Sequence, residues 1–229
     1  SYDSLSYEVE LHSVPKENWR SFLEDGEFDF FLAESIWKGH DEQWIWAMSS
    51  PDSPNGIRLQ SMLEYCSEIG LKKVFWNKED PVNYEKFIST ARCFDVIFTS
   101  DNRSISRYRK DCGHEKIYPM PFACQPVIHN PVRNKLPTYQ TCFAGSWYIR
   151  EHGDRKRQTK LLVDAAKNYD LHVYDRFYGT NDRNRFPEEY DEFVRGSLPY
   201  EECCMAYRSY KIFLNVNSVM NSDTMFSRR

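Results

Sequence analysis

The chain has 229 residues, of which 41% are hydrophobic and 28% charged, a composition that argues against extensive disorder. Its formal net charge is −4 and its acidic and basic residues are interspersed, so no basic stripe for nucleic acid is expected. The seven cysteines never show C-x-x-C spacing, and the six histidines show neither H-x-x-x-H nor H-E-x-x-H spacing. These patterns exclude the common zinc sites and do not suggest a disulfide framework.

Short β-rich runs alternate along the chain with amphipathic helical patterns, which is typical of parallel α/β units. Strands are predicted, in chain order, at residues 28–33, 73–76, 95–99, 116–118, 141–144, 171–174 and 211–216. Helices are predicted from apolar positions at i, i+3, i+4 and i+7 over residues 59–66, 84–91, 161–169 and 203–210. Asp80-Pro81 predicts one helix start, with Asp80 as the capping residue, and Ser197-Leu198-Pro199 predicts another.

Five prolines between Pro119 and Pro137 interrupt this alternation and indicate a connector. We therefore expect an N-terminal Rossmann-like domain over residues 1–125, a linker over 126–138 and the first part of a second Rossmann-like domain over 139–229. No apolar run is long enough to span a bilayer, and the N-terminal residues lack the pattern of a signal segment. The predicted location is the cytoplasm, with reduced thiols, and a peripheral position at the inner face of the membrane is the alternative.

Ligands of open parallel sheets bind where the strands end, because loops and helix N-termini offer unpaired N–H groups there. The polar residues that follow the predicted strands form two sets, one rich in carboxylates and one rich in small polar residues and arginine. In the first half they are Glu34, Ser35, Trp37, Asn77, Lys78, Glu79, Asp80, Ser100, Asp101 and Asn102; in the second half they are Gly145, Ser146, Asp175, Arg176, Asn217 and Ser218. The two sets predict a ligand in a cleft between the domains.

Several of these residues also have structural explanations. Asp80 is more simply a helix cap, and Gly145-Ser146 is by itself only a tight turn. The basic run Arg155–Arg157 fits a phosphate clamp and a solvated helix face equally well, and Arg228-Arg229 is either a phosphate-binding pair or a frayed end. Walker A, G-x-S-x-G and G-x-G-x-x-G motifs are absent, which weighs against P-loop, α/β-hydrolase and dinucleotide-dependent functions.

Four blocks in order give the chain a family resemblance: FWNKEDP (75–81), CFAGS (142–146), GSLPY (196–200) and FLNVNS with TMFSRR (213–218 and 224–229). Together they resemble the CgeB-type, or spore-maturation-type, glycosyltransferases. The resemblance spans nearly the whole chain and implies a GT-B architecture, in which two Rossmann-like domains face each other and the second binds the nucleotide sugar. Members of this kind are bacterial and are associated with spore-coat, cell-wall or capsule-like material.

The resemblance also implies roles for individual residues. Gly145 and Ser146 would approach the donor diphosphate, with Arg155, Lys156 and Arg176 near it. The sugar-nucleotide site would be lined by Asn217, Ser218, Thr224, Phe226, Ser227 and Arg228. Glu34, Trp37, Asn77 and Glu79 would lie on the acceptor side. Two departures from the family are expected to matter: Thr224 falls where related enzymes carry the earlier Glu of an E-x7-E pair, and the family's first strand and later donor-gripping helix are not seen in the sequence.

The implied reaction transfers a sugar from a nucleoside diphosphate sugar, a UDP sugar in the first instance, to a glycan or protein acceptor of the cell surface, the spore coat or a polysaccharide. Backbone N–H groups and cations would stabilise the leaving diphosphate without a metal ion or other cofactor. Glu79 is the predicted base if the enzyme inverts configuration. The alternatives are a non-catalytic glycan- or nucleotide-binding scaffold and a nucleoside diphosphate sugar epimerase.

Overall fold

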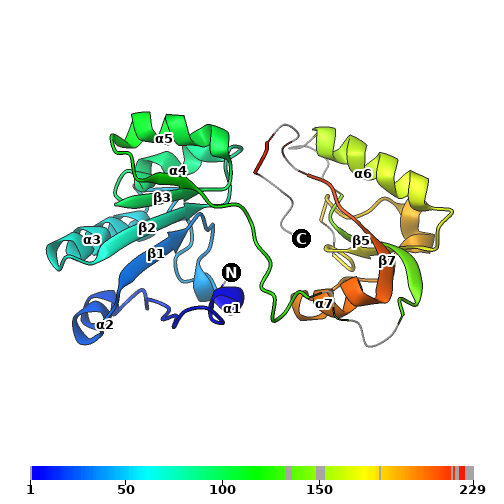
Figure 1. The fold of residues 1–229 in the computed structure, drawn as a ribbon, viewed down its shortest axis with the longest axis horizontal. Helices are drawn as coiled ribbons and strands as arrows, with labels where there is room; N and C mark the ends of the chain where they lie inside the picture. Colours follow the sequence, from blue (N-terminus) through cyan, green and yellow to red (C-terminus); the bar gives the residue numbers. More distant parts are fainter. Residues whose placement is uncertain are drawn as a thin grey trace. The chain divides into compact units, whose positions relative to one another are not determined.

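The protein folds into two compact α/β units, each with its own parallel sheet (Figure 1). The structure is a computed structural model that describes residues 2–130, 132, 136–147, 153–180, 182–217, 219 and 222–224. The first unit contains the chain up to Ala123, and Val219 and residues 222–224 return to it from the end of the chain. The second unit consists of the described residues from Cys124 to Asn217. The predicted fold class, α/β with parallel strands, is confirmed.

The first unit contains four strands and their connecting helices. In chain order its elements are α1 (Tyr2–Leu5), α2 (Trp19–Asp25), β1 (Phe30–Glu34), η1 (His40–Glu42), α3 (Pro54–Glu68), β2 (Lys72–Asn77), α4 (Tyr84–Ala91), β3 (Val96–Thr99), η2 (Asn102–Ser104), α5 (Ile105–Cys112) and β4 (Ile117–Pro119). The strands are parallel and lie in the order β1-β2-β3-β4. Their register pairs Glu34 with Trp76 and Asn77 with Thr99, so the residues that follow them gather at one edge.

The core of the first unit lies between this sheet and its helices. Phe75 of β2 and Phe87 of α4 are fully buried, as are Met62 of α3 and Tyr108 of α5. Burying an aromatic side chain of this size stabilises the fold by about 1.5–3 kcal/mol, so each helix is held mainly by its apolar face. This packing gives the polar strand ends a rigid base.

In the second unit, the chain adds strands first on one side of β5 and then on the other. Its elements are β5 (Tyr139–Gly145), α6 (Gly153–Ala166), β6 (Leu171–Asp175), η3 (Glu188–Phe193), α7 (Tyr200–Ser209) and β7 (Tyr210–Leu214). Val194 forms a single parallel bridge with Val173 of β6, outside the strand order β6-β5-β7. From the bridge inward, this is the 3-2-1-4 order of the first four strands of a Rossmann fold.

The reversal determines how the helices are placed. The chain moves from β5 to β6 in one direction and then returns past β5 to β7. Right-handed crossovers then require α6 and α7 to cover opposite faces of the sheet, as Figure 1 shows. A topological switch point therefore lies between the carboxyl ends of β5 and β7.

All seven predicted strands and four predicted helices overlap elements of the structure, but both predicted helix starts are displaced. Helix α4 begins at Tyr84 with Asn83 as its N-cap residue, so the prediction that Asp80 caps this helix is wrong. Helix α7 begins at Tyr200, directly after Pro199, and Ser197 does not cap it. Helix α5 was not predicted from the spacing of apolar residues.

Candidate functional site

The carboxyl end of the first sheet carries a buried polar cluster built from β2, β3 and α5. Asn77, Asp80 and Thr99 are fully buried, and so is Tyr108. The Asn77 amide donates to Asp80 Oδ1 at 2.9 Å, the Tyr108 hydroxyl donates to the same oxygen at 3.2 Å, and Thr99 Oγ1 donates to Asp80 Oδ2 at 2.6 Å. The Asp80 carboxyl group therefore joins the ends of two strands to α5.

Burial changes the acidity of this carboxyl group. Removal from water raises the pKa of Asp80 from 3.8 to about 7, although the hydrogen bonds from Thr99 and Tyr108 act in the opposite direction. Among the described residues, its hydrogen-bond partners are an amide and two hydroxyl groups. Strongly shifted carboxyl groups occur both at functional sites and in structural networks. Asp80 is shielded from solvent, so its position supports a structural role beneath the surface of the edge.

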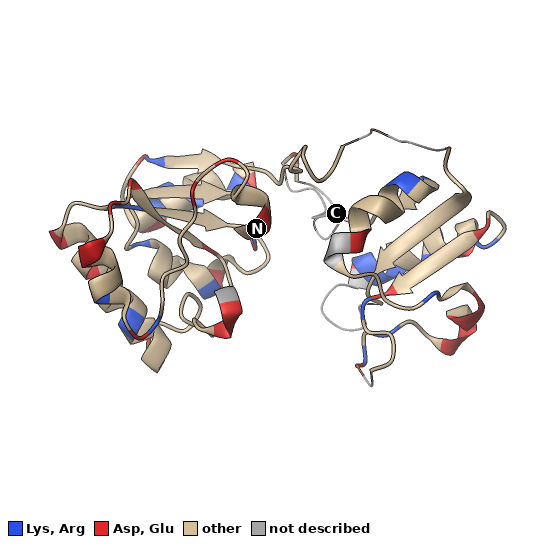
Figure 2. Ribbon diagram, turned by 90° about the horizontal axis from the view of Figure 1, so that it is seen from below, with Lys and Arg blue, Asp and Glu red and all other residues tan. Residues whose placement is uncertain are grey.

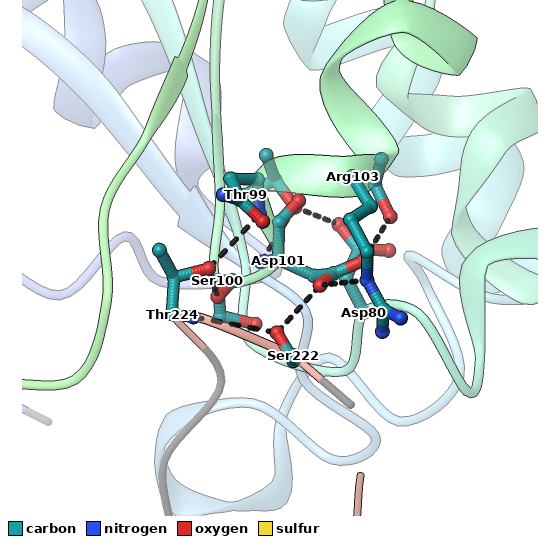
Figure 3. Close-up of polar contacts among 9 residues, drawn as sticks. Asp80, Thr99, Ser100, Asp101, Arg103, Ser222 and Thr224 are labelled. Atoms are coloured by element: carbon teal, nitrogen blue, oxygen red, sulfur yellow. Dashed lines mark hydrogen bonds and ion pairs between the residues drawn. The ribbon is translucent and has the colours of Figure 1, made fainter. Parts of the chain in front are cut away.

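The turn after β3 binds the segment that returns from the end of the chain (Figure 3). Ser222 Oγ donates to Asp101 Oδ1 at 2.6 Å. Thr224 Oγ1 donates to the Ser100 carbonyl oxygen and accepts from the Asn102 N–H, both at 2.9 Å. Asp101 is almost fully buried, and its carboxylate also accepts from Ser104 Oγ and Arg103 Nε. Thr224, predicted to line a donor site in the second domain, is thus placed in the first unit.

The end of β1 carries an ion pair of low exposure. Lys78 Nζ lies 2.6 Å from Glu34 Oε2, and the two side chains are only 12% and 16% exposed. The ammonium also lies 5.2 Å from the centre of the Trp76 ring. Trp37, further along this connection, is partly buried and packs edge-on against Phe87 and Trp46. Glu34 and Trp37 therefore lie in the same unit, with Glu34 paired to Lys78 and Trp37 held in the aromatic core.

The two other predicted acceptor-side residues are engaged within the β2–α4 turn. Asn77 is fully buried, and its amide donates to Tyr108 as well as to Asp80. Glu79 is half-buried, and its Oε2 accepts from Asn83 Nδ2 at 2.9 Å. The structure brings Glu34, Asn77 and Glu79 to one sheet edge, and it places Asp80, which sequence reasoning treated as a cap, at the centre of the polar network.

In the second unit, the predicted glycine and serine follow the central strand at the switch point. Gly145 ends β5, and Ser146 comes directly after it. Ser146 is 3% exposed, and its Oγ has no hydrogen-bond partner among the described residues. A buried hydroxyl without a hydrogen-bond partner destabilises the fold. The Ser146 hydroxyl can therefore donate to or accept from a ligand, and it lies at the position where Rossmann-type sheets bind ligands.

The turn after β6 fixes the surroundings of Gly145. Asp175 is 1% exposed, and its carboxylate accepts from the N–H groups of Phe177 and Phe186 at 3.0 and 2.9 Å. The Arg176 N–H donates to the Gly145 carbonyl oxygen at 2.9 Å, while its side chain is exposed. Asp175 therefore shapes the loops, and the structure brings Arg176 beside Gly145.

The remaining predicted donor residues lie on three segments. Arg155 and Lys156 are in the first turn of α6, and both are half-buried. Asn217 is exposed and follows β7, which pairs with β5 through Phe143 and Leu214. Ser218, Phe226, Ser227 and Arg228 lie outside the described residues.

Charge, metal-ligand and membrane features give no further indication of a site. Figure 2 shows acidic and basic residues interspersed along the elements of both units. Within the described ranges, no three His, Cys, Asp or Glu side chains form a group suited to a metal ion. Among the helices whose residues are described, none has the length and apolar character required to cross a bilayer. The sequence matches no protein-family model and shows no significant match to curated proteins.

Proposed function

We propose that this protein is a glycosyltransferase of the GT-B type, which moves a sugar from a nucleoside diphosphate sugar to a cell-surface, spore-coat or polysaccharide acceptor. In this proposal the two units are the two Rossmann-like halves of the enzyme. The second unit binds the donor and the first contributes the acceptor side. The sequence blocks that resemble the CgeB-type transferases support this proposal, since CFAGS ends at Ser146 and FLNVNS begins within β7.

One structural observation carries the donor side of the proposal. The strand order of the second unit creates a switch point between β5 and β7, and the buried, unpartnered Ser146 Oγ lies directly after β5. A diphosphate oxygen would accept from this hydroxyl, and Arg155 or Lys156 would supply positive charge. These groups would stabilise the charge that develops on the departing nucleoside diphosphate during glycosyl transfer.

The first test is thermal unfolding of the protein with UDP, GDP, ADP and TDP sugars. At a ligand concentration of about 100 times Kd, binding stabilises the native state by about 2.7 kcal/mol. For a chain of this size we expect Tm to rise by about 5–10 °C with the cognate nucleotide sugar. Transfer to an acceptor is then measured with that donor. The absence of a shift with all four nucleotide classes would contradict the proposal, and a shift without transfer or hydrolysis would favour a non-catalytic nucleotide-binding scaffold.

The basic residues of α6 provide a second prediction. Replacing both Arg155 and Lys156 with Gln should raise the Kd of the nucleotide sugar by roughly 5- to 30-fold, as expected for loss of a charge-assisted phosphate contact. Stability of the free protein should not fall, because cations at a helix N-terminus oppose the helix dipole. Isothermal titration measures Kd, and Arg157→Gln is the control, since Arg157 is exposed and 3.9 Å from Asp154. Equal effects of the control and the double variant would rule out a specific clamp.

A further inference from the structure

We propose that the turn Ser100–Asp101–Asn102 of the first unit is a binding site for neighbouring hydroxyl groups of a saccharide acceptor. In the structure, Ser222 and Thr224 of the protein itself occupy this turn with their own hydroxyls. The inference rests on the proposed function and deepens it, because it assigns the acceptor side to one turn and its ligand to the class of polyhydroxylated sugars.

The first argument is the chemistry of the contacts that the turn makes. The Asp101 carboxylate accepts from the hydroxyl of Ser222 at Oδ1. The second hydroxyl, that of Thr224, lies between a backbone acceptor on Ser100 and a backbone donor on Asn102, so both of its hydrogen-bonding functions are satisfied. The turn therefore offers a carboxylate acceptor, a carbonyl acceptor and an N–H donor. These groups can bind two adjacent hydroxyls of a sugar, because each hydroxyl donates one hydrogen bond and can accept others.

The second argument is that the turn has hydrogen-bonding capacity that Ser222 and Thr224 leave unfilled. Ser100 is fully buried, and its Oγ has no partner among the described residues. Asn102 Oδ1 is also buried without a described partner. Buried polar atoms in native proteins are rarely unsatisfied, and two within one three-residue turn call for further hydroxyl or water groups. A sugar ring carries more hydroxyls than the two side chains that now fill the turn.

The third argument is that the turn is held in place from behind. Ser104 Oγ and Arg103 Nε donate to the Asp101 carboxylate at 3.1 and 3.2 Å. The Asp101 N–H donates to Thr99 Oγ1, which in turn donates to Asp80. The carboxylate therefore keeps its position when the Ser222 hydroxyl is removed. The turn also follows β3, at the edge where parallel sheets bind ligands.

Competition between the internal hydroxyls and a sugar gives the test. We would titrate the double variant Ser222→Ala with Thr224→Val, which removes both hydroxyls at nearly constant volume, with the methyl glycosides of glucose, galactose, mannose and N-acetylglucosamine. Amide chemical shifts of residues 100–104 report binding. If the internal groups occupy the turn about 90% of the time, Kd for at least one glycoside should be about tenfold lower in the variant than in the wild type. Cyclohexanol, a ring with one hydroxyl, is the control ligand and should not bind.

Two further measurements keep the test decisive. Thr224→Ser retains the hydroxyl and should behave as the wild type. In the wild-type protein, saturating glycoside should speed hydrogen exchange at Thr224 as its side chain is displaced, a result that does not depend on whether the double variant folds. Unchanged shifts at residues 100–104 with every glycoside, or equal shifts with cyclohexanol, would overturn the inference. The thermal shift with nucleotide sugars should be the same in all variants, so failure of donor binding and failure of this site are separately visible.

Discussion

Replacing Asp80 with asparagine is expected to abolish most of a pH-dependent loss of stability that the wild-type protein undergoes between about pH 4 and pH 7. The pKa of Asp80 is about 7 in the folded state and 3.8 in its ordinary state, because the folded protein removes the carboxyl group from water. Between these values the folded protein retains a proton that the unfolded chain releases. The stabilising contribution of Asp80 to the free energy of unfolding is therefore fully present below about pH 4 and is lost as the pH rises through 7.

The expected size of this effect is large. A difference of about three pH units corresponds to up to about 4 kcal/mol in the free energy of unfolding. Asparagine is a suitable replacement because its oxygen can accept from Asn77 and Tyr108, while its amide can donate to Thr99 Oγ1. The Thr99 hydroxyl then donates to the Asp101 carbonyl oxygen, which lies 3.3 Å away.

The measurement is urea unfolding at pH 4.5, 6 and 8, followed by tryptophan fluorescence. Trp19, Trp37, Trp44, Trp46 and Trp76 all belong to the first unit, so the signal reports mainly on that unit. Other titrating groups are common to both proteins and cancel in the difference between them. Asp80→Ala is the companion variant and should cost about 2–4 kcal/mol at pH 5, because it leaves buried donors without a partner. Parallel stability curves of the wild type and Asp80→Asn would refute the explanation.

Asp175→Ala is expected to destabilise the second unit by about 3 kcal/mol and to abolish the nucleotide-sugar binding that we propose for it. The carboxylate accepts two backbone hydrogen bonds, and loss of a charge-assisted bond of this kind costs about 1.5–3 kcal/mol. Phe186 is buried, so its N–H would lose its partner in a site that water reaches poorly. The loops released in this way include Arg176, whose N–H holds the Gly145 carbonyl oxygen.

Hydrogen exchange of the β5 amides measures the stability of the second unit, and thermal shift with a nucleotide sugar measures binding. Asp182→Ala is the matched control, because Asp182 lies in the same connection but, among the residues that the structure describes, its carboxylate accepts only from the Asn184 N–H. We expect it to cost less than about 1 kcal/mol and to leave binding intact. Indistinguishable results for the two alanine variants would mean that Asp175 does not organise the switch point.

The positions of the strands along the chain could be predicted from the sequence because they depend on local patterns. Each strand is a short apolar run. The polar residues that follow it mark its carboxyl end, where parallel sheets bind ligands. Gly145 and Ser146 were found in this way, and the structure places Gly145 at the end of the central strand of its sheet and Ser146 directly after it. Strand order could not be predicted, because pairing between strands depends on contacts between distant parts of the chain.

The polar network of the first unit shows the limit of local reasoning. Asp80 before a proline has the appearance of a helix cap, and only the partners Thr99 and Tyr108, which lie 19 and 28 residues away, show that its carboxyl group is buried. A signal for α5 was present, since Ile105, Tyr108 and Cys112 follow helical spacing and Gly113 ends the helix with a φ of 75°. No local pattern predicts that Ser222 and Thr224 bind the β3 turn.

This return of the chain affects how the protein is made. The ribosome synthesises the partners of Ser100, Asp101 and Asn102 more than 120 residues after the turn itself. At about 5–20 residues per second, the nascent first unit waits roughly 6–25 s before these partners of the turn are synthesised. Its last hydrogen bonds form only after the intervening second unit has emerged, so maturation of the first unit is linked to synthesis of residues 222–224.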